Sequence, residues 1–286
     1  MLKPGKQEYI NKEAHAQLTV HIGQLATDNL LAGKVVLITG ATKGIGYAIA
    51  EACVNQAAKV IITGRKQEEL DAACAKLGPS CATMILDVCQ TDRFGNFLQE
   101  ATKLFGNIDC LVNNAGISLH EGDFMNVTEQ TWDAQIATNL KAPYFLTQAW
   151  VRYYREKGMK QGRIIMMASD TSGMGSSIPY GITKAGVSSF TRGLAKHIVR
   201  EGIRVNAIAP GTTKTAMTDC WTEGKIVRTT TEGWRTLFPE EIAQTCVFLL
   251  SDLSTCISGQ VIGCTEANIC FDNTVDNISL EKETNP

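Results

Sequence analysis

The sequence lacks the residue spacings that mark metal centres and disulfide frameworks. Its four histidines, His15, His21, His120 and His197, show no metal-ligand spacing with one another or with the cysteines. The 10 cysteines are scattered singly and form no C-x-x-C pair. We therefore expect no metal, and thiols that behave as small apolar residues in a reducing compartment.

Long apolar runs and a dominant charge are absent as well. No segment reaches membrane-spanning length without a charge, and the N-terminus has no uninterrupted apolar core of the signal-peptide type. The formal net charge is -2 and the basic residues are dispersed, which argues against a nucleic-acid footprint or a polybasic membrane patch. These absences predict a cytoplasmic protein that binds neither nucleic acid nor a membrane.

What is present is a strand–helix alternation that suits one large α/β domain. Amphipathic stretches at residues 47–55, 68–77, 128–156 and 180–200 separate short apolar runs. The predicted strands are residues 35–39, 60–63, 83–86, 110–113, 163–168, 204–208 and 260–262. Right-handed crossovers then predict a single doubly wound Rossmann-type domain with a seven-stranded parallel sheet, whose ligands gather at the carboxyl ends of the strands.

The two ends of the chain fall outside this pattern. Residues 1–30 form an N-terminal extension in which a short helix is predicted around residues 12–22. Residues 268–286 are rich in Asn, Thr, Asp and Glu with little periodicity, so we expect a flexible tail.

A glycine-rich turn follows the first predicted strand and opens a helix. It reads Gly40-Ala41-Thr42-Lys43-Gly44-Ile45-Gly46. Without side chains at the glycines, the backbone can approach a pyrophosphate, which the N–H groups and dipole of the helix N-terminus then attract. The turn predicts a dinucleotide site.

The end of the second predicted strand bears on the choice of dinucleotide. An acid there would accept hydrogen bonds from a ribose 2′-OH, but this chain has Gly64 followed by Arg65. Arg65 can bind a 2′-phosphate with two hydrogen bonds, and Lys43 supplies a second cation. The alternative for each cation alone is a solvated surface position; together with the missing acid they favour NADP(H) over NAD(H).

Tyr180 and Lys184 are four residues apart and share one face of a predicted helix. A nearby ammonium favours the phenolate form of tyrosine and lowers its pKa, so Tyr180 can exchange a proton with an alcohol or carbonyl. This spacing also occurs on many solvated helices, so only the surrounding motifs can distinguish a catalytic pair from two surface residues.

That context is the order of the motifs along the chain. The glycine turn is followed by Asn113-Asn114-Ala115-Gly116, then by Asn139, Ser169, Tyr180, Lys184 and Pro210-Gly211. In this arrangement the chain resembles a short-chain dehydrogenase/reductase over residues 31–267.

The resemblance implies roles for four catalytic residues. Tyr180 would be the acid/base, and Lys184 would lower its pKa and bind the nicotinamide ribose. Ser169 would hydrogen-bond the substrate oxygen, and Asn139 would bend its helix and hold a water that leads protons to the lysine.

The resemblance also implies further cofactor contacts. Asp87 and Val88 would contact adenine, and the backbone of Asn114 would meet the ribose. The carboxamide end of nicotinamide would be held by the loop after the sixth strand, at Pro210, Gly211, Thr213 and Thr215. Residues 213–237 would form a substrate lid.

One departure from the family pattern concerns the interval from Ser169 to Tyr180, which is shorter than the family usually shows. Ser172, Ser176 and Ser177 therefore compete for the serine role, although Ser169 alone directly follows an apolar strand.

The leading function is an NADP(H)-dependent oxidoreductase that moves hydride between nicotinamide and a ketone or secondary alcohol. The resemblance leaves 3-oxoacyl thioesters, steroids and sugars or polyols open as substrates. A catalytically idle NADP-binding sensor or scaffold is the alternative from another class. A reductase that docks a carrier protein is a third, with Lys160 and Arg163 as candidates for its basic rim.

The resemblance further implies a homotetramer, with a dimer as the alternative. Relatives pair two long helices across a twofold axis, and here those segments carry many apolar side chains, some of which cover the chain's own core. They include Trp132, Ile136, Phe145, Trp150, Val187 and Phe190.

Overall fold

A seven-stranded, fully parallel sheet forms the centre of the computed structural model, as expected. The structure describes residues 5–10, 17–22, 29–173, 175–219 and 235–265. The strand order is β5-β4-β3-β6-β7-β8-β9. The strands are β3 (Val35–Thr39), β4 (Lys59–Gly64), β5 (Cys81–Ile85), β6 (Cys110–Asn113), β7 (Gly162–Met167), β8 (Ile203–Pro210) and β9 (Val261–Cys264).

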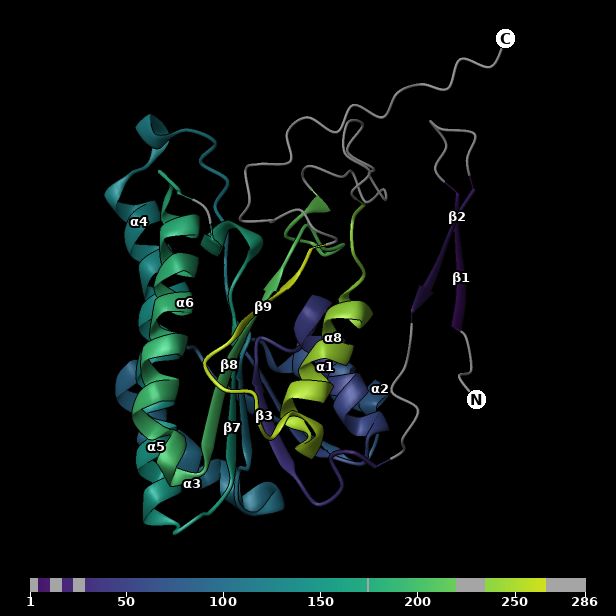
Figure 1. Cartoon of the computed structure of the whole chain (residues 1–286), viewed down its shortest axis with the longest axis vertical. Coiled ribbons are helices and arrows are strands. Elements are labelled where there is room, and N and C mark those ends of the chain that lie inside the picture. Colours follow the sequence, from purple (N-terminus) through teal and green to yellow (C-terminus); the bar gives the residue numbers. More distant parts are fainter. Residues whose placement is uncertain (1–4, 11–16, 23–28, 174, 220–234, 266–286) are drawn as a thin grey trace.

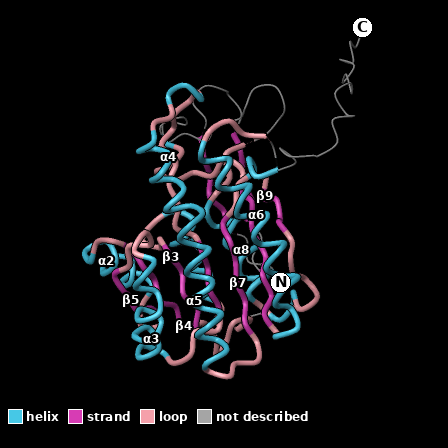
Figure 2. Tube along the Cα trace, turned by 90° about the vertical axis from the view of Figure 1, so that its left-hand side faces the viewer, coloured by secondary structure: helices cyan, strands magenta, loops and turns pink. Residues whose placement is uncertain are grey.

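Helices cover both faces of this sheet, which makes the fold doubly wound (Figure 1). One layer contains α1 (Gly44–Asn55), α2 (Gln67–Leu77) and α8 (Pro239–Leu250). The opposite layer contains α3 (Phe94–Phe105), α5 (Ala142–Glu156) and α6 (Pro179–Ile198), and Figure 2 views it face on. Within the described part of the chain, no helix is long and apolar enough to cross a membrane.

Two apolar clusters hold the layers to the sheet. Val36 and Ile38 of β3 belong to the cluster under α1 and α8, whereas Leu37 belongs to the cluster under α3 and α5. Successive strand residues point to opposite faces, so a strand covered on both sides needs an unbroken apolar run. This is why the strands could be predicted from such runs.

The chain changes direction across the sheet between β3 and β6, which are hydrogen-bonded neighbours. The helix after β3 covers one face and the helices after β6 cover the other. Their connections diverge at the carboxyl ends of the two strands, and open α/β sheets bind ligands at such a point.

The predicted helix over residues 128–156 is continuous but not uniform. Thr128 caps α4 (Glu129–Ile136) in a capping box with Thr131. A π-helical turn, η3 (Ala137–Lys141), then joins α4 to α5. Single π turns are rare in proteins, and those that do occur are often found at functional sites.

The N-terminal extension contains a two-stranded antiparallel sheet instead of the predicted helix. It pairs β1 (Gly5–Ile10) with β2 (Gln17–Ile22). The helix prediction is wrong for residues 17–22, where Leu18, Val20 and Ile22 alternate with polar residues at the two-residue period of a strand. Most of the predicted lid, residues 220–234, and the predicted tail lie outside the described residues.

The apolar residues named for subunit contact differ in exposure. Trp150 and Val187 are buried in the chain's own core, so they do not face a partner. Ile136 and Phe190 are half-buried. Trp132 and Phe145 are 40% and 39% exposed, and Tyr144 of α5, which was not named, is 42% exposed. Assembly through these exposed aromatic side chains stays a prediction.

Candidate active site

The glycine turn forms a cradle that only glycine can line. Gly40 and Gly44 have φ angles of 64° and 60°, a region that favours glycine. A Cβ at Gly40 would lie 2.9 Å from the Ala115 Cα, and one at Gly46 would lie 2.5 Å from the Gly40 carbonyl oxygen. Helix α1 begins at Gly44 with no side-chain cap from Lys43 and no acid in its first turn. Its open N–H groups fit the pyrophosphate of a dinucleotide.

Asn114 fixes this cradle from the neighbouring strand. Its Nδ2 donates hydrogen bonds to the backbone oxygens of Thr39 and Gly40, both at 2.9 Å. Its backbone N–H donates to the Thr39 hydroxyl at 3.0 Å. The sequence predicted only a backbone contact between Asn114 and ribose; the structure adds a side-chain bridge between the end of β6 and the turn after β3.

The corner expected to select the dinucleotide contains both cations and an acid, Glu69, that no sequence pattern marks. Lys43 and Arg65 are exposed. Glu69, on the first turn of α2, accepts a hydrogen bond from the Thr42 hydroxyl at 3.5 Å and pairs with Lys66 at 3.0 Å. The hydrogen bond and charge of Lys66 lower the pKa of Glu69, and the charge of Lys43 adds to this effect.

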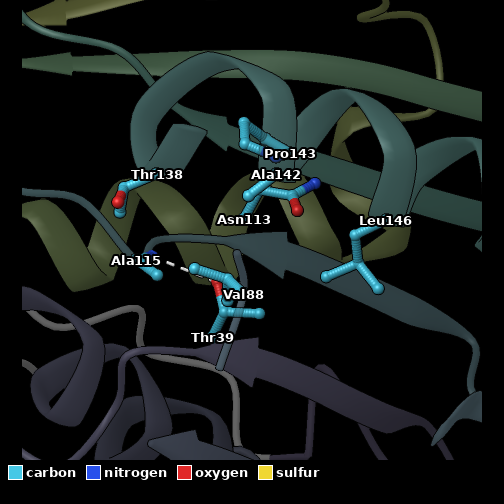
Figure 3. Close-up of a pocket in the computed structure, with 8 residues that line it drawn as sticks. All are labelled: Thr39, Val88, Asn113, Ala115, Thr138, Ala142, Pro143 and Leu146. Atoms are coloured by element: carbon cyan, nitrogen blue, oxygen red, sulfur yellow. Dashed lines mark hydrogen bonds between the residues drawn. The ribbon is translucent and has the colours of Figure 1, made fainter. Parts of the chain in front are cut away.

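A small pocket lies beside the ends of β3 and β6 (Figure 3). Asp87 accepts a hydrogen bond from the Cys89 N–H at 3.0 Å, which fixes the turn after β5. Val88 lines the pocket, and the adenine contact of Asp87 and Val88 stays a prediction. The lining residues are Thr39, Val88, Asn113, Ala115, Thr138, Ala142, Pro143 and Leu146.

Asn139 occupies the π-helical turn and is buried. Its Nδ2 donates to the Ile117 carbonyl oxygen at 2.8 Å, and its Oδ1 accepts from the Ile117 N–H at 2.9 Å. A longer bond, 3.3 Å, joins Nδ2 to the Thr183 hydroxyl on α6. The amide therefore ties the segment after β6 to the helix that carries Tyr180 and Lys184.

Lys184 is almost fully buried, and its Nζ donates to the Met167 carbonyl oxygen at 2.7 Å. Burial lowers the pKa of Lys184 to about 8. A Cβ built on Gly116 would lie 3.5 Å from this Nζ and 3.3 Å from Asn139 Oδ1. The lysine and the asparagine thus meet beside the same glycine.

Tyr180 lies next to Lys184, whose Nζ is 5.7 Å from the centre of the phenol ring. Burial raises the pKa of Tyr180, a hydrogen bond with Ser169 acts against this increase, and the charge of Asp170 adds to it. The pKa of Tyr180 is thus raised in this structure, whereas a lowered value was predicted, because desolvation has the largest effect on the phenol.

Ser169 follows β7 after one residue, Ala168, and is the serine that contacts Tyr180. Its Oγ donates to Asp170 Oδ1 at 2.8 Å. The short interval before Tyr180 forms the 3-10 turn η4 (Asp170–Gly173), which contains Ser172, whereas the Ser176 hydroxyl bonds the backbone of Ile178. This geometry supports the choice of Ser169 over those two serines.

The loop after β8 lies against the glycine turn. Gly211 N–H donates to the Cys264 carbonyl oxygen at 2.9 Å, and the buried Thr213 pairs with Leu237 in a parallel bridge. A Cβ at Gly44 would lie 3.3 Å from Thr215 Cγ2. Pro210, the last residue of β8, starts this loop, so the predicted nicotinamide contacts are gathered beside the cradle.

The two candidates for a carrier-docking rim lie at the other end of the sheet. Arg163 belongs to the start of β7, whose carboxyl end leads into Ser169. Its side chain is buried and pairs with Asp252. The suggestion that Arg163 and Lys160 form a rim near the pocket mouth is therefore wrong. Among the described residues, no group of three His, Cys, Asp or Glu side chains is placed to hold a metal.

Comparisons with known proteins agree with this geometry. A family model described as Enoyl-(Acyl carrier protein) reductase matches residues 40–265. The 3-oxoacyl-[acyl-carrier-protein] reductase of Vibrio cholerae is 36% identical over 236 residues, covering 81% of this chain and 96% of its own. Human dehydrogenase/reductase SDR family member 4 is 33% identical over 239 residues, covering 81% of this chain and 86% of its own.

The chain belongs to the short-chain dehydrogenase/reductase family. It is therefore an oxidoreductase of the kind that acts on CH–OH and C=O groups with a nicotinamide cofactor. A solved 3-ketoacyl-(acyl-carrier-protein) reductase from Brucella melitensis, complexed with NADH, superposes with a TM-score of 0.75 at 28% identity; the match covers 82% of this chain and 97% of that one. A putative short-chain alcohol dehydrogenase from Sinorhizobium meliloti has a TM-score of 0.72 at 33% identity, with 82% and 95% covered.

Proposed function

We propose that this short-chain dehydrogenase/reductase is an NADP(H)-dependent reductase of ketones, with Tyr180 as its acid/base. The observation that carries the proposal is the meeting of Asn139, Ser169, Tyr180 and Lys184 beside the glycine cradle. An idle nucleotide sensor would need the cradle but not a phenol and serine in contact next to a buried ammonium.

The chemistry divides between the cofactor and this chain's own residues. The bound nicotinamide supplies or accepts the hydride. Tyr180 donates its proton to the substrate oxygen during reduction, and the raised pKa keeps its phenol protonated at neutral pH. Ser169 hydrogen-bonds the same oxygen as negative charge develops on it.

Lys184 and Asn139 support that proton transfer. With a pKa of about 8, Lys184 is mostly charged at pH 7, and the cation lies under the ring that loses its proton. Asn139 anchors the backbone of Ile117 beside the lysine, where a water can carry protons onward.

The preference for NADP(H) rests on the corner at the end of β4. Gly64 offers no carboxylate to a 2′-OH, and the exposed Lys43 and Arg65 can both reach a 2′-phosphate. The NADH in the Brucella relative belongs to that protein. The two cations of this chain support the opposite choice here.

The test combines a substrate screen with one substitution. Purified protein and NADPH are mixed with ketoacyl thioesters, steroids, keto sugars and quinones, and absorbance of NADPH is followed. Tyr180→Phe should reduce turnover about 100-fold or more while NADPH binding, measured by fluorescence, is retained. A Phe variant that keeps more than about a tenth of the rate would show that another group transfers the proton.

A further inference from the structure

One charged group beside Ser169 has no part in the proposed mechanism. The carboxylate of Asp170 accepts the Ser169 hydroxyl hydrogen at 2.8 Å and the Thr171 N–H at 2.8 Å, both on Oδ1. Its charge also acts on the Tyr180 phenol. Asp170 therefore lies within the group of residues that meet the substrate oxygen.

Asp170 and the substrate oxygen compete for the hydroxyl hydrogen of Ser169. A serine hydroxyl has a single hydrogen to donate. While Ser169 donates it to Asp170, the same hydrogen cannot stabilise a substrate oxygen. A carboxylate is also a stronger acceptor than a neutral ketone, because hydrogen bonds to charged groups are the stronger ones.

When Ser169 turns to the substrate, Asp170 loses the donor that the serine provides. A partly buried carboxylate that loses a donor is destabilised unless another group replaces it. A substrate can supply the replacement if it carries an O–H or N–H close to its carbonyl. A substrate with only acceptor oxygens there places their lone pairs against the carboxylate and gives it no hydrogen.

We propose that Asp170 is a specificity-determining residue that selects ketones carrying a hydroxyl or protonated amine next to the carbonyl. The substrate's donor takes the place of the Ser169 hydroxyl on the carboxylate, and Ser169 then donates to the carbonyl oxygen. The inference rests on the proposed reductase function. It favours sugar- or polyol-like ketones over 3-oxoacyl thioesters and over steroid ketones that have no hydroxyl beside the carbonyl.

The experiment compares three small ketones with the same carbon chain. With NADPH present, kcat/KM is measured for 3-hydroxy-2-butanone, for its methyl ether 3-methoxy-2-butanone, and for 2-butanone. The hydroxy ketone should exceed both others by about ten- to hundredfold, the usual worth of a charged hydrogen bond. In Asp170→Ala, the ratio of kcat/KM for the hydroxy ketone to kcat/KM for each other ketone should be close to one. Asp170→Asn keeps a neutral acceptor, so its ratio should lie between those of Asp170→Ala and the unmodified protein.

Asp92 provides the matched control, because it is an exposed acid on the turn before α3. Asp92→Asn changes the net charge equally and should keep the full ratio. A merely structural role for Asp170 would lower kcat/KM for all three ketones together and leave the ratio intact, and that result overturns the inference.

The remaining outcomes separate this inference from the proposed function. If ketones are reduced but the unmodified protein shows a ratio near one, the selection is refuted and the reductase stands. If NADPH binds and no ketone of the panel or of the wider screen is reduced, the reductase function fails and the selection with it. Should Asp170→Ala not fold by circular dichroism, the ratios of the unmodified protein and of Asp170→Asn decide.

Discussion

Replacing Lys184 by methionine should stabilise the protein at neutral pH while abolishing its chemistry. Lys184 is buried, and burial lowers its pKa from 10.5 to about 8. At pH 7 the lysine is charged in both the folded and the unfolded state, so the full cost of burying the charge is present. Methionine fills a similar volume without that cost.

The size of the effect follows from the pKa difference. About 2.5 pH units correspond to about 3 kcal/mol at pH 7. The variant also leaves the Met167 carbonyl oxygen without its hydrogen bond, which costs about 1 kcal/mol. The free energy of unfolding of Lys184→Met should therefore exceed that of the unmodified protein by about 2 kcal/mol at pH 7.

The pH dependence has a definite sign. Between pH 8 and 10.5 the unfolded state binds more protons than the folded state, so the lysine's contribution to stability rises with pH. The advantage of Lys184→Met should shrink to roughly zero near pH 9.5.

Urea unfolding of Lys184→Met and of the unmodified protein, at pH 7 and at pH 9.5, measures the difference in their free energies of unfolding at each pH. Lys196→Met is the control, because Lys196 is an exposed lysine on the same helix. A Lys184→Met advantage that is absent at pH 7, or equal at both pH values, would refute the argument.

Three further predictions concern the cofactor, the serine and assembly. Arg65→Ala should weaken NADPH binding about ten- to hundredfold and leave NADH binding nearly unchanged, as measured by calorimetry; equal affinity of the unmodified protein for both would contradict the proposed preference. Ser169→Ala should lower kcat more than Ser172→Ala, and the reverse order would show that the serine was misassigned. We expect a homotetramer that Phe145→Asp dissociates, because this aromatic side chain is exposed on α5; sedimentation that finds a fully active monomer would count against it.

Much of the fold could be predicted because the sheet is parallel and covered on both faces. Val35–Thr39 is an unbroken apolar run ending in threonine, and the structure contains that strand with the same bounds. The N-terminal extension was misread for a different reason. Its strands pair only with each other, so no buried run marks them, and alternation over six residues is a weak signal.

Some residues of the candidate site could be predicted from the sequence and others could not. Residues such as Gly40 and Tyr180 belong to local patterns, and a pattern can be read from neighbouring positions. Glu69 and Asp170 belong to none, because their importance arises from contacts with Thr42 and Ser169 that depend on how a loop closes. The pKa of Tyr180 was misjudged because helix spacing places a cation nearby but says nothing about desolvation.

The π-helical turn between α4 and α5 makes this region sensitive to chain length. A π turn holds one residue more than the α-helical path needs. Deleting one residue between Ala137 and Lys141 would let residues 129–156 form one regular helix in which α4 and α5 keep nearly their present faces. The wide turn that holds the buried Asn139 against Ile117 would be lost, however, together with the two hydrogen bonds between these residues. Insertions and deletions here should therefore be tolerated far less well than substitutions, although the segment is helical throughout.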